Sequence, residues 1–172
     1  MEKYSLNMRI MHWVVGVALI ALLTIGVIMV ELPKEDPFKF QLFGIHKAIG
    51  FFVMLLVIAR VIIRLKSNIP PAPNVFKRYE IWLSNLTHKT LYLLMLIVPI
   101  SGYLMSYFGG HPIKIFDFAI PSFLPINHEF GTFFWKTHGI AANILIYLII
   151  IHVLAVFKHY FFDKINILKR IW

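Results

Sequence analysis

The sequence predicts an all-α integral membrane protein, a four-helix bundle with both termini on the same side of the membrane. Three observations lead to this prediction: the 172 residues are 59% hydrophobic, their mean hydropathy is +0.77, and four long apolar stretches contain no Asp or Glu. A soluble domain is about 45–50% apolar and about a quarter charged, whereas 15% of this chain is charged. A net charge of +9 is compatible with nucleic acid binding in a soluble protein, but a chain this apolar needs a membrane.

Each apolar stretch is long enough to cross a bilayer, which takes roughly 20 residues of helix. The expected spans run from Ile10 to Val30, from Ile45 to Leu65, from Leu86 to Phe108 and from His138 to Phe161. Helices are expected because a single lipid-exposed strand leaves its backbone polar groups unpaired. Segments rich in Pro, Gly and charged residues separate the spans, and we expect residues 1–172 to form one transmembrane domain.

The basic residues predict which side of the membrane each segment occupies. With four spans, the N-terminus, the second loop and the C-terminus share one side, which carries twelve of the seventeen Lys and Arg residues. Cytoplasmic segments carry the excess of Lys and Arg, so both termini are expected in the cytoplasm. Three of the eight acidic residues share that side, so it holds the entire net charge.

Histidine is the residue type most able to carry chemistry in this chain. The absence of cysteine excludes disulfides, thiolate-bound metals and thiol catalysis. Ionisable groups within a membrane are costly and usually functional. Five of the eight histidines lie within the apolar stretches, and a sixth, His159, lies near the end of the last one. The other two, His111 and His128, are in the third loop and are expected to face solvent.

The histidines of the last span predict two ligand pairs at different depths. His138 and His152 are fourteen residues apart, which is about 21 Å of helix and returns to roughly the same face. His12 matches the depth of His152, and His46 matches that of His138. One intramembrane histidine is as readily a packing residue as a ligand, but two such pairs favour two haem groups, each iron with an imidazole on either side. A Zn²⁺ or Cu²⁺ pathway or a proton relay would normally include Asp or Glu in the spans.

Two further histidines are expected at the cytoplasmic end. His88 lies near that end of the third span, and His159 near that end of the fourth. Each is either an interfacial residue solvated by lipid headgroups or part of a quinone site, where imidazole donates to a quinone carbonyl and passes protons.

Four basic side chains are candidates for contacts with haem propionates or with a substrate. Arg60 and Arg64, one turn apart in the second span, either reach the lipid headgroups or pair with propionates. Lys47 and Lys136 each adjoin an expected ligand near the outer side of the membrane, away from the cytoplasm. They are candidates for pairing with propionates and, as catalytic residues at the outer mouth, for attracting an anion.

The histidine-centred motifs resemble those of the bacterial cytochrome b561 family of four-helix, di-haem membrane proteins. The resemblance covers essentially the whole chain. It rests on Met11-His12-Trp13, Gly44-Ile45-His46, Arg60-Val61-Ile62-Ile63-Arg64-Leu65, His88 with Tyr92, Pro99 and Gly102, His138 with Ala142-Asn143, His152, and His159-Tyr160-Phe161. It implies haem b ligation by His12 with His152 and by His46 with His138, and places His88 and His159 at the quinone end. It also implies a location in the bacterial inner membrane.

Three functions remain open at this point. Family members that resemble this chain are superoxide oxidases, which implies that it takes electrons from periplasmic superoxide and reduces ubiquinone at the cytoplasmic face. The alternative is an electron-transfer subunit that accepts electrons from a docked periplasmic redox protein. A third interpretation is a membrane protein without redox activity whose histidines pack or bind metal.

Overall fold

The computed structural model describes residues 1–115, 118–121 and 124–172. Its long helices are α1 (Leu6–Glu31), α2 (Pro37–Lys66), α3 (Arg78–Phe108) and α4 (His128–Phe161). All four are long and apolar enough to cross a membrane, which confirms the predicted all-α, four-helix membrane fold. Each helix contains the expected span, but α2, α3 and α4 begin well before it, so parts of the expected loops are helical.

Polar caps explain the early starts of α2 and α4. Pro37 is the first residue of α2, and the Asp36 side chain accepts a hydrogen bond from the backbone N–H of Phe38. The Asn127 side chain accepts from the first backbone N–H groups of α4 in the same way. A capping side chain pairs N–H groups that have no partner within the helix. The helices therefore begin at caps in the loops, beyond the apolar stretches.

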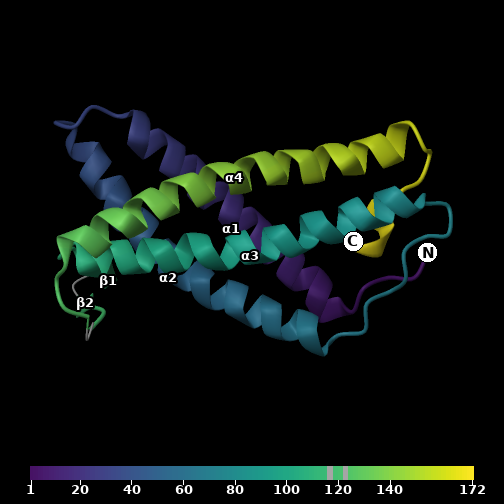
Figure 1. The fold of residues 1–172 in the computed structure, drawn as a ribbon, viewed down its shortest axis with the longest axis horizontal. Coiled ribbons are helices and arrows are strands. Elements are labelled where there is room, and N and C mark those ends of the chain that lie inside the picture. Colours follow the sequence, from purple (N-terminus) through teal and green to yellow (C-terminus); the bar gives the residue numbers. More distant parts are fainter. Residues whose placement is uncertain (116–117, 122–123) are drawn as a thin grey trace.

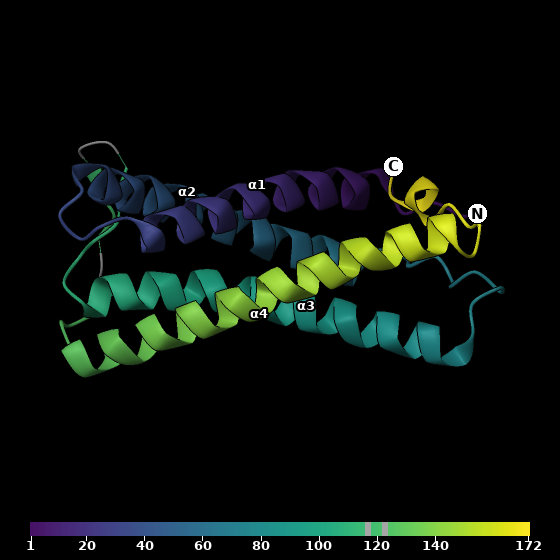
Figure 2. The same ribbon diagram turned by 90° about the horizontal axis from the view of Figure 1, so that it is seen from above.

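The helices run antiparallel in sequence order and form two layers (Figures 1 and 2). α1 packs with α2, α3 packs with α4, and α2 with α3 joins the two pairs. Both chain termini lie at one end of the bundle, called here the termini end, together with the α2–α3 connection. The other end, called here the opposite end, holds the α1–α2 and α3–α4 connections.

Three short elements lie outside the four helices. Strands β1 (Lys114–Ile115) and β2 (Phe118–Ala119) pair antiparallel in the α3–α4 connection. The 3₁₀ helix η1 (Ile167–Arg170) follows α4 at the termini end. Arg170 donates to the backbone carbonyls of Pro70 and Pro71 at 2.9 and 2.8 Å, so the C-terminal segment is tied to the α2–α3 connection.

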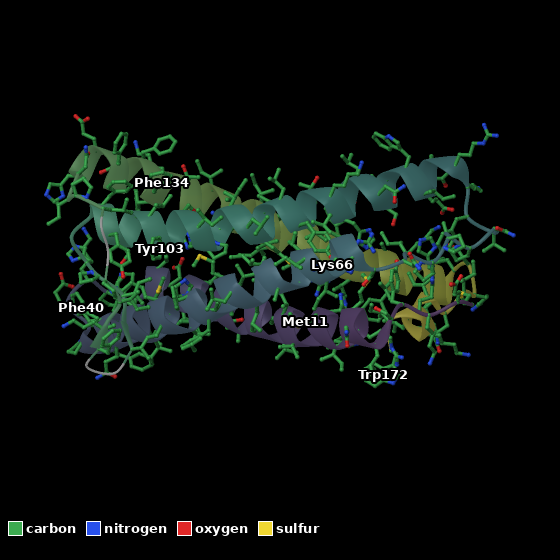
Figure 3. All side chains as sticks on the ribbon, turned by 90° about the horizontal axis from the view of Figure 1, so that it is seen from below. Met11, Phe40, Lys66, Tyr103, Phe134 and Trp172 are labelled. Atoms are coloured by element: carbon green, nitrogen blue, oxygen red, sulfur yellow. The ribbon has the colours of Figure 1, made fainter. Side chains whose placement is uncertain are left out.

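The core lies along the bundle axis and is small. Val15, Val57 and Leu145 are fully buried at its centre, one from each of α1, α2 and α4. Many large apolar side chains on the outer helix faces are exposed, as expected of surfaces that contact lipid tails. Figure 3 shows that nitrogen and oxygen atoms gather mainly toward the two ends of the bundle, whereas carbon dominates its outer middle.

Candidate functional site

The structure brings the four predicted ligand histidines together as two pairs. The rings of His12 on α1 and His152 on α4 have centroids 6.4 Å apart. The rings of His46 on α2 and His138 on α4 have centroids 6.2 Å apart. The first pair lies toward the termini end and the second toward the opposite end, since α4 runs between these ends.

The ring separations suit a metal held between two imidazoles. Two imidazoles on opposite sides of one metal have centroids roughly 6.3 Å apart, if each nitrogen lies about 2 Å from the metal and about 1.1 Å from its ring centre. The observed 6.4 and 6.2 Å agree with that value. One pair connects α1 with α4 and the other connects α2 with α4. The backbones in each of these helix pairs pack less closely than those of α3 and α4.

Backbone groups and glycines surround the pair at the opposite end. Nδ1 of His138 donates to the Val98 carbonyl at 2.8 Å, which leaves Nε2 free to bind a metal. A Cβ atom added to Gly102 would lie 3.0 Å from Cε1 and Nδ1 of His138, and one added to Gly26 would lie 3.6 Å from Cε1 of His46. Nδ1 of His46 is buried without a hydrogen bond of standard geometry. These features fit a histidine pair that faces a group between the helices.

Charged and titratable side chains surround the pair at the termini end. Arg60 donates to Nδ1 of His12 at 3.0 Å and to the Met11 carbonyl at 2.9 Å. Its guanidinium also lies 5.5 Å from the centroid of the Tyr92 ring. Arg60 therefore points into the bundle beside a predicted ligand. Arg64, one turn further along α2, is half-buried.

The two histidines expected near a quinone occupy different surroundings. His88 lies beside the termini-end pair, with its ring 5.4 Å from that of His152 and Nδ1 2.6 Å from the Ser84 carbonyl. His159 stacks on Phe76 at 4.5 Å, and its Nδ1 donates to Asp163 at 2.6 Å. The structure thus adds a third imidazole to the termini-end pair, which the spacing argument did not predict.

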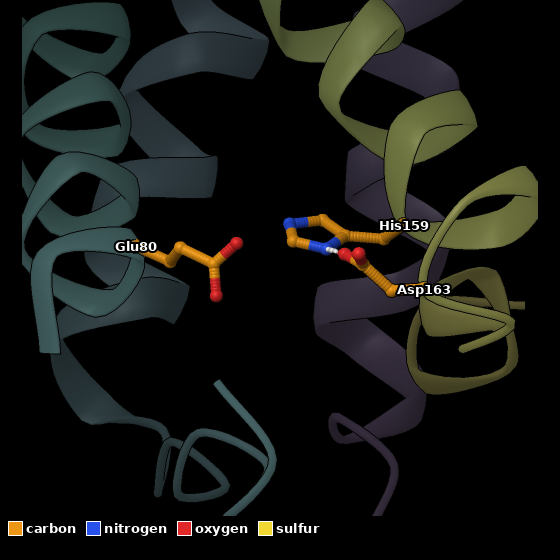
Figure 4. Close-up of side chains that lie close together, drawn as sticks. All are labelled: Glu80, His159 and Asp163. Carbon is orange, nitrogen blue, oxygen red and sulfur yellow. Dashed lines mark hydrogen bonds and ion pairs between the residues drawn. The ribbon is translucent and has the colours of Figure 1, made fainter. Parts of the chain in front are cut away.

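An ion-pair cluster around His159 was not predicted from the sequence. Lys158 donates to Glu80 at 2.6 Å and to Asp163 at 2.7 Å, so it joins the start of α3 to the end of α4. Figure 4 shows His159 and Asp163 facing Glu80 across the gap between these helices. The hydrogen bond from Lys158 holds the pKa of the Asp163 carboxyl below its ordinary value, and that from His159 adds to the effect. The four-residue spacing of His159 and Asp163 is a local signal, but nothing local connects either to Glu80.

Of the candidate residues at the opposite end, Lys136 is exposed and Lys47 is half-buried. Nζ of Lys47 donates to the His111 carbonyl at 3.2 Å. Lys136 lines an open surface hollow of about 530 Å³ with His128, Glu129, Thr132 and Phe133. His111 and His128 are exposed, as predicted.

The fold and the paired histidines define a class of protein: a four-helix membrane protein of the cytochrome type. A sequence model described as prokaryotic cytochrome b561 matches residues 3–172, so this chain belongs to the prokaryotic cytochrome b561 family. It is a multi-pass bacterial membrane protein of a family that binds haem b and transfers electrons.

Individual relatives cover nearly the whole chain. Cytochrome b561 homolog 2 of Escherichia coli strain K12 is 30% identical over 98% of this chain and 90% of its own length. A Yersinia pestis protein named "Probable superoxide oxidase CybB" is 27% identical over 98% of this chain and 95% of its own length. Cytochrome b561 homolog 1 of E. coli strain K12 is 26% identical over 99% of this chain and 97% of its own length.

Proposed function

We propose that this chain is a di-haem b cytochrome that oxidises superoxide at the periplasmic face and reduces ubiquinone at the cytoplasmic face. The observation that carries the proposal is the presence of two histidine pairs with centroid separations of 6.4 and 6.2 Å toward opposite ends of the bundle. His12 and His152 hold one haem, and His46 and His138 hold the other. When bound, the two haems supply one-electron carriers between the two faces of the membrane.

The termini end faces the cytoplasm in this proposal. The support is the sequence: twelve of seventeen Lys and Arg residues lie on the side of the termini and the second loop. The His46–His138 pair is then the periplasmic pair, and the His12–His152 pair is the cytoplasmic pair.

The side chains around each pair prepare it for a cofactor in different ways. The hydrogen bond to the Val98 carbonyl fixes the proton of His138 on Nδ1. Nδ1 of His12 instead accepts from Arg60, which leaves the imidazole proton on Nε2. Nε2 can bind iron only when the proton moves to Nδ1, and the Arg60 guanidinium must then donate to another acceptor. A haem propionate is such an acceptor, which favours propionate binding over headgroup contact for Arg60. Arg64 is the second propionate candidate on the same helix.

The periplasmic end receives the electron donor. Superoxide is an anion, and a lysine-lined mouth raises its local concentration. Lys47 is anchored to the His111 carbonyl and Lys136 lines a surface hollow, so both place positive charge near the His46–His138 pair. The name of the Y. pestis relative supports superoxide as the donor.

The cytoplasmic end receives the acceptor. Two superoxide ions become two dioxygen molecules, and their two electrons with two protons convert ubiquinone to ubiquinol. His88 lies beside His152, and His159 is oriented by Asp163, so both are positioned to donate protons to quinone oxygens.

A superoxide flux delivered to the oxidised, purified protein tests this function. We expect b-type absorption, haem reduction that superoxide dismutase prevents, and transfer of the electrons to added ubiquinone. Absence of b-type absorption would overturn the haem assignment itself.

The competing function is an electron-transfer subunit for a periplasmic redox protein. Exposed aromatic side chains near the opposite end, including Phe130, Phe133 and Trp135, favour it because they offer a docking surface. Haems that stay oxidised in superoxide but are reduced by a periplasmic electron carrier would establish this function in place of the first.

A further inference from the structure

Two carboxylates and an imidazole converge at the termini end, away from the histidine pairs. One ligand atom from each of Glu80, His159 and Asp163 lies within 4.8 Å of the others (Figure 4). Glu80 comes from the first turn of α3, His159 from the last turn of α4, and Asp163 from the turn that follows it. The cluster also holds a cation already, because Nζ of Lys158 lies 2.6 Å from Glu80 and 2.7 Å from Asp163.

We propose that Glu80, His159 and Asp163 form a binding site for a divalent transition-metal ion of the Zn²⁺ class, for which Lys158 is the competing cation. One imidazole nitrogen and two carboxylate oxygens are ligands that Zn²⁺ accepts, and three protein ligands leave a further position for water. The imidazole favours Zn²⁺ over Mg²⁺ or Ca²⁺, which prefer oxygen ligands alone.

The charges of the cluster favour a divalent ion. Two ionised carboxylates carry two negative charges, and the Lys158 ammonium balances one of them. A divalent ion balances both. The Lys158 side chain is 46% exposed, so it can turn outward to water or lipid phosphate when a metal takes its place. Glu80 and His159 are more sheltered, with side chains 14% and 12% exposed, which keeps the ligand atoms near one another.

Metal binding involves no change in oxidation state. Nδ1 of His159 now donates its proton to Asp163; when the metal binds Nδ1, the neutral imidazole carries its one proton on Nε2 instead. Tetrahedral ligands about 2 Å from zinc lie roughly 3.3 Å from one another, so the side chains must close by up to about 1.5 Å from their present 4.8 Å limit. Rotation of the Asp163 side chain, which is 31% exposed, and small adjustments of Glu80 provide a movement of this size.

Occupation of this site would regulate the quinone end, a consequence that rests on the proposed function. A metal bound to Nδ1 keeps His159 from becoming an imidazolium, which is the form that gives a proton to a quinone oxygen. We therefore expect Zn²⁺ to slow ubiquinone reduction and to leave haem reduction by superoxide unchanged.

Calorimetric titration of the haem-loaded, detergent-solubilised protein with Zn²⁺ tests the site, using a purification tag without histidine. We expect one saturable site. Glu80→Gln and Asp163→Asn should each weaken binding by about tenfold or more, whereas Lys158→Ala should strengthen it. Glu129→Gln and His128→Ala, at the other end of α4, are the matched controls and should leave the affinity unchanged.

Each remaining outcome contradicts a particular part of the proposal. An affinity that Glu80→Gln and Asp163→Asn leave unchanged, or that Lys158→Ala weakens, overturns the site. Binding at this site without slower ubiquinone reduction overturns its regulatory role. The titration needs no turnover, so a protein that binds Zn²⁺ here but does not oxidise superoxide contradicts the proposed function and supports the metal site.

Discussion

The two histidine pairs have similar ring separations but different surroundings. Backbone and glycines border the pair at the opposite end: the Val98 carbonyl accepts from His138, and Gly102 lies against its ring. Charged and titratable groups border the pair at the termini end, where Arg60 contacts His12 and the His88 ring lies near His152. In the first pair, close packing against Gly102 and a hydrogen bond to a backbone carbonyl position the His138 ring. In the second pair, a hydrogen bond from a charged side chain, Arg60, positions the His12 ring.

This difference matches the chemistry proposed for each end. One-electron transfer from superoxide needs no proton, so the pair at the opposite end can lie in a rigid apolar setting. Reduction of a quinone needs two electrons and two protons, so the pair at the termini end benefits from imidazoles and cations nearby. The ion pairs of the described residues also lie at the termini end.

Replacing a predicted ligand has the largest expected effect on this comparison. We expect His138→Ala to remove the haem at the opposite end and to leave the other, halving the haem content per protein. His12→Ala should remove only the haem at the termini end. The haemochrome assay gives the haem-to-protein ratio, and absorption spectra of the two variants identify which haem remains. Loss of both haems, or of neither, from a folded variant would contradict the pairing.

The membrane fold and the histidine pairing were accessible from the sequence for a specific reason. Bilayer thickness imposes a length on each span, and the helical rise converts the separation of His138 and His152 into a depth. The contacts of Arg60 were not accessible, because the sequence is equally compatible with a side chain that reaches the headgroups. Glu80 joins His159 only through the packing of α3 on α4, which no local spacing encodes.

A methyl group at Gly102 should disturb the pair at the opposite end selectively. The added Cβ would lie 3.0 Å from the His138 ring, so the ring must shift by a few tenths of an ångström. The hydrogen bond from its Nδ1 to the Val98 carbonyl resists that shift. We expect Gly102→Ala to weaken retention of that haem and to leave the other unchanged. Gly26→Ala is the matched control, because its Cβ would lie 3.6 Å from His46, an ordinary contact.

Haem retention on dilution, followed by absorption, measures this effect. Alanine is favoured over glycine in a helix by up to about 1 kcal/mol, so a loss of haem from Gly102→Ala does not reflect a weaker helix. Equal haem loss from Gly102→Ala and Gly26→Ala would contradict the expectation that close packing of Gly102 against His138 positions this ligand.

Removing the charge of Arg60 should shift a reduction potential at the termini end. A nearby cation stabilises the reduced haem, which carries one positive charge fewer, so Arg60→Gln should lower the potential of the His12–His152 haem. Arg60→Lys, which keeps the charge, should lower it less. Spectroelectrochemical titration resolves the two haems. A larger shift in the reduction potential of the His46–His138 haem would contradict the inference that charged side chains act mainly on the pair at the termini end.

The smallest expected effect concerns the stability that the ion pairs add at the termini end. The pKa of Asp163 is held below its ordinary value by the hydrogen bond from Lys158, so the folded state favours the ionised carboxyl. Its stabilisation is fully present above the ordinary carboxyl pKa of about 3.9 and is lost as the pH falls through the lowered native value. Asp163→Asn should therefore lower Tm slightly at pH 7, because exposed ion pairs contribute little.

The pH dependence of this difference separates charge from packing. Thermal unfolding of wild-type and Asp163→Asn protein, measured from pH 7 downward, should show a constant gap in Tm to about pH 4 and a closing gap below it. Ser84→Ala is the control, because Ser84 contacts His88 rather than this cluster. Any difference in Tm between wild-type and Ser84→Ala protein should not shrink below about pH 4. A gap for Asp163→Asn that persists unchanged in acid would mean that the amide disturbs the turn after α4 sterically. The carboxylate charge of Asp163 would then add nothing to the stability of the ion-pair cluster.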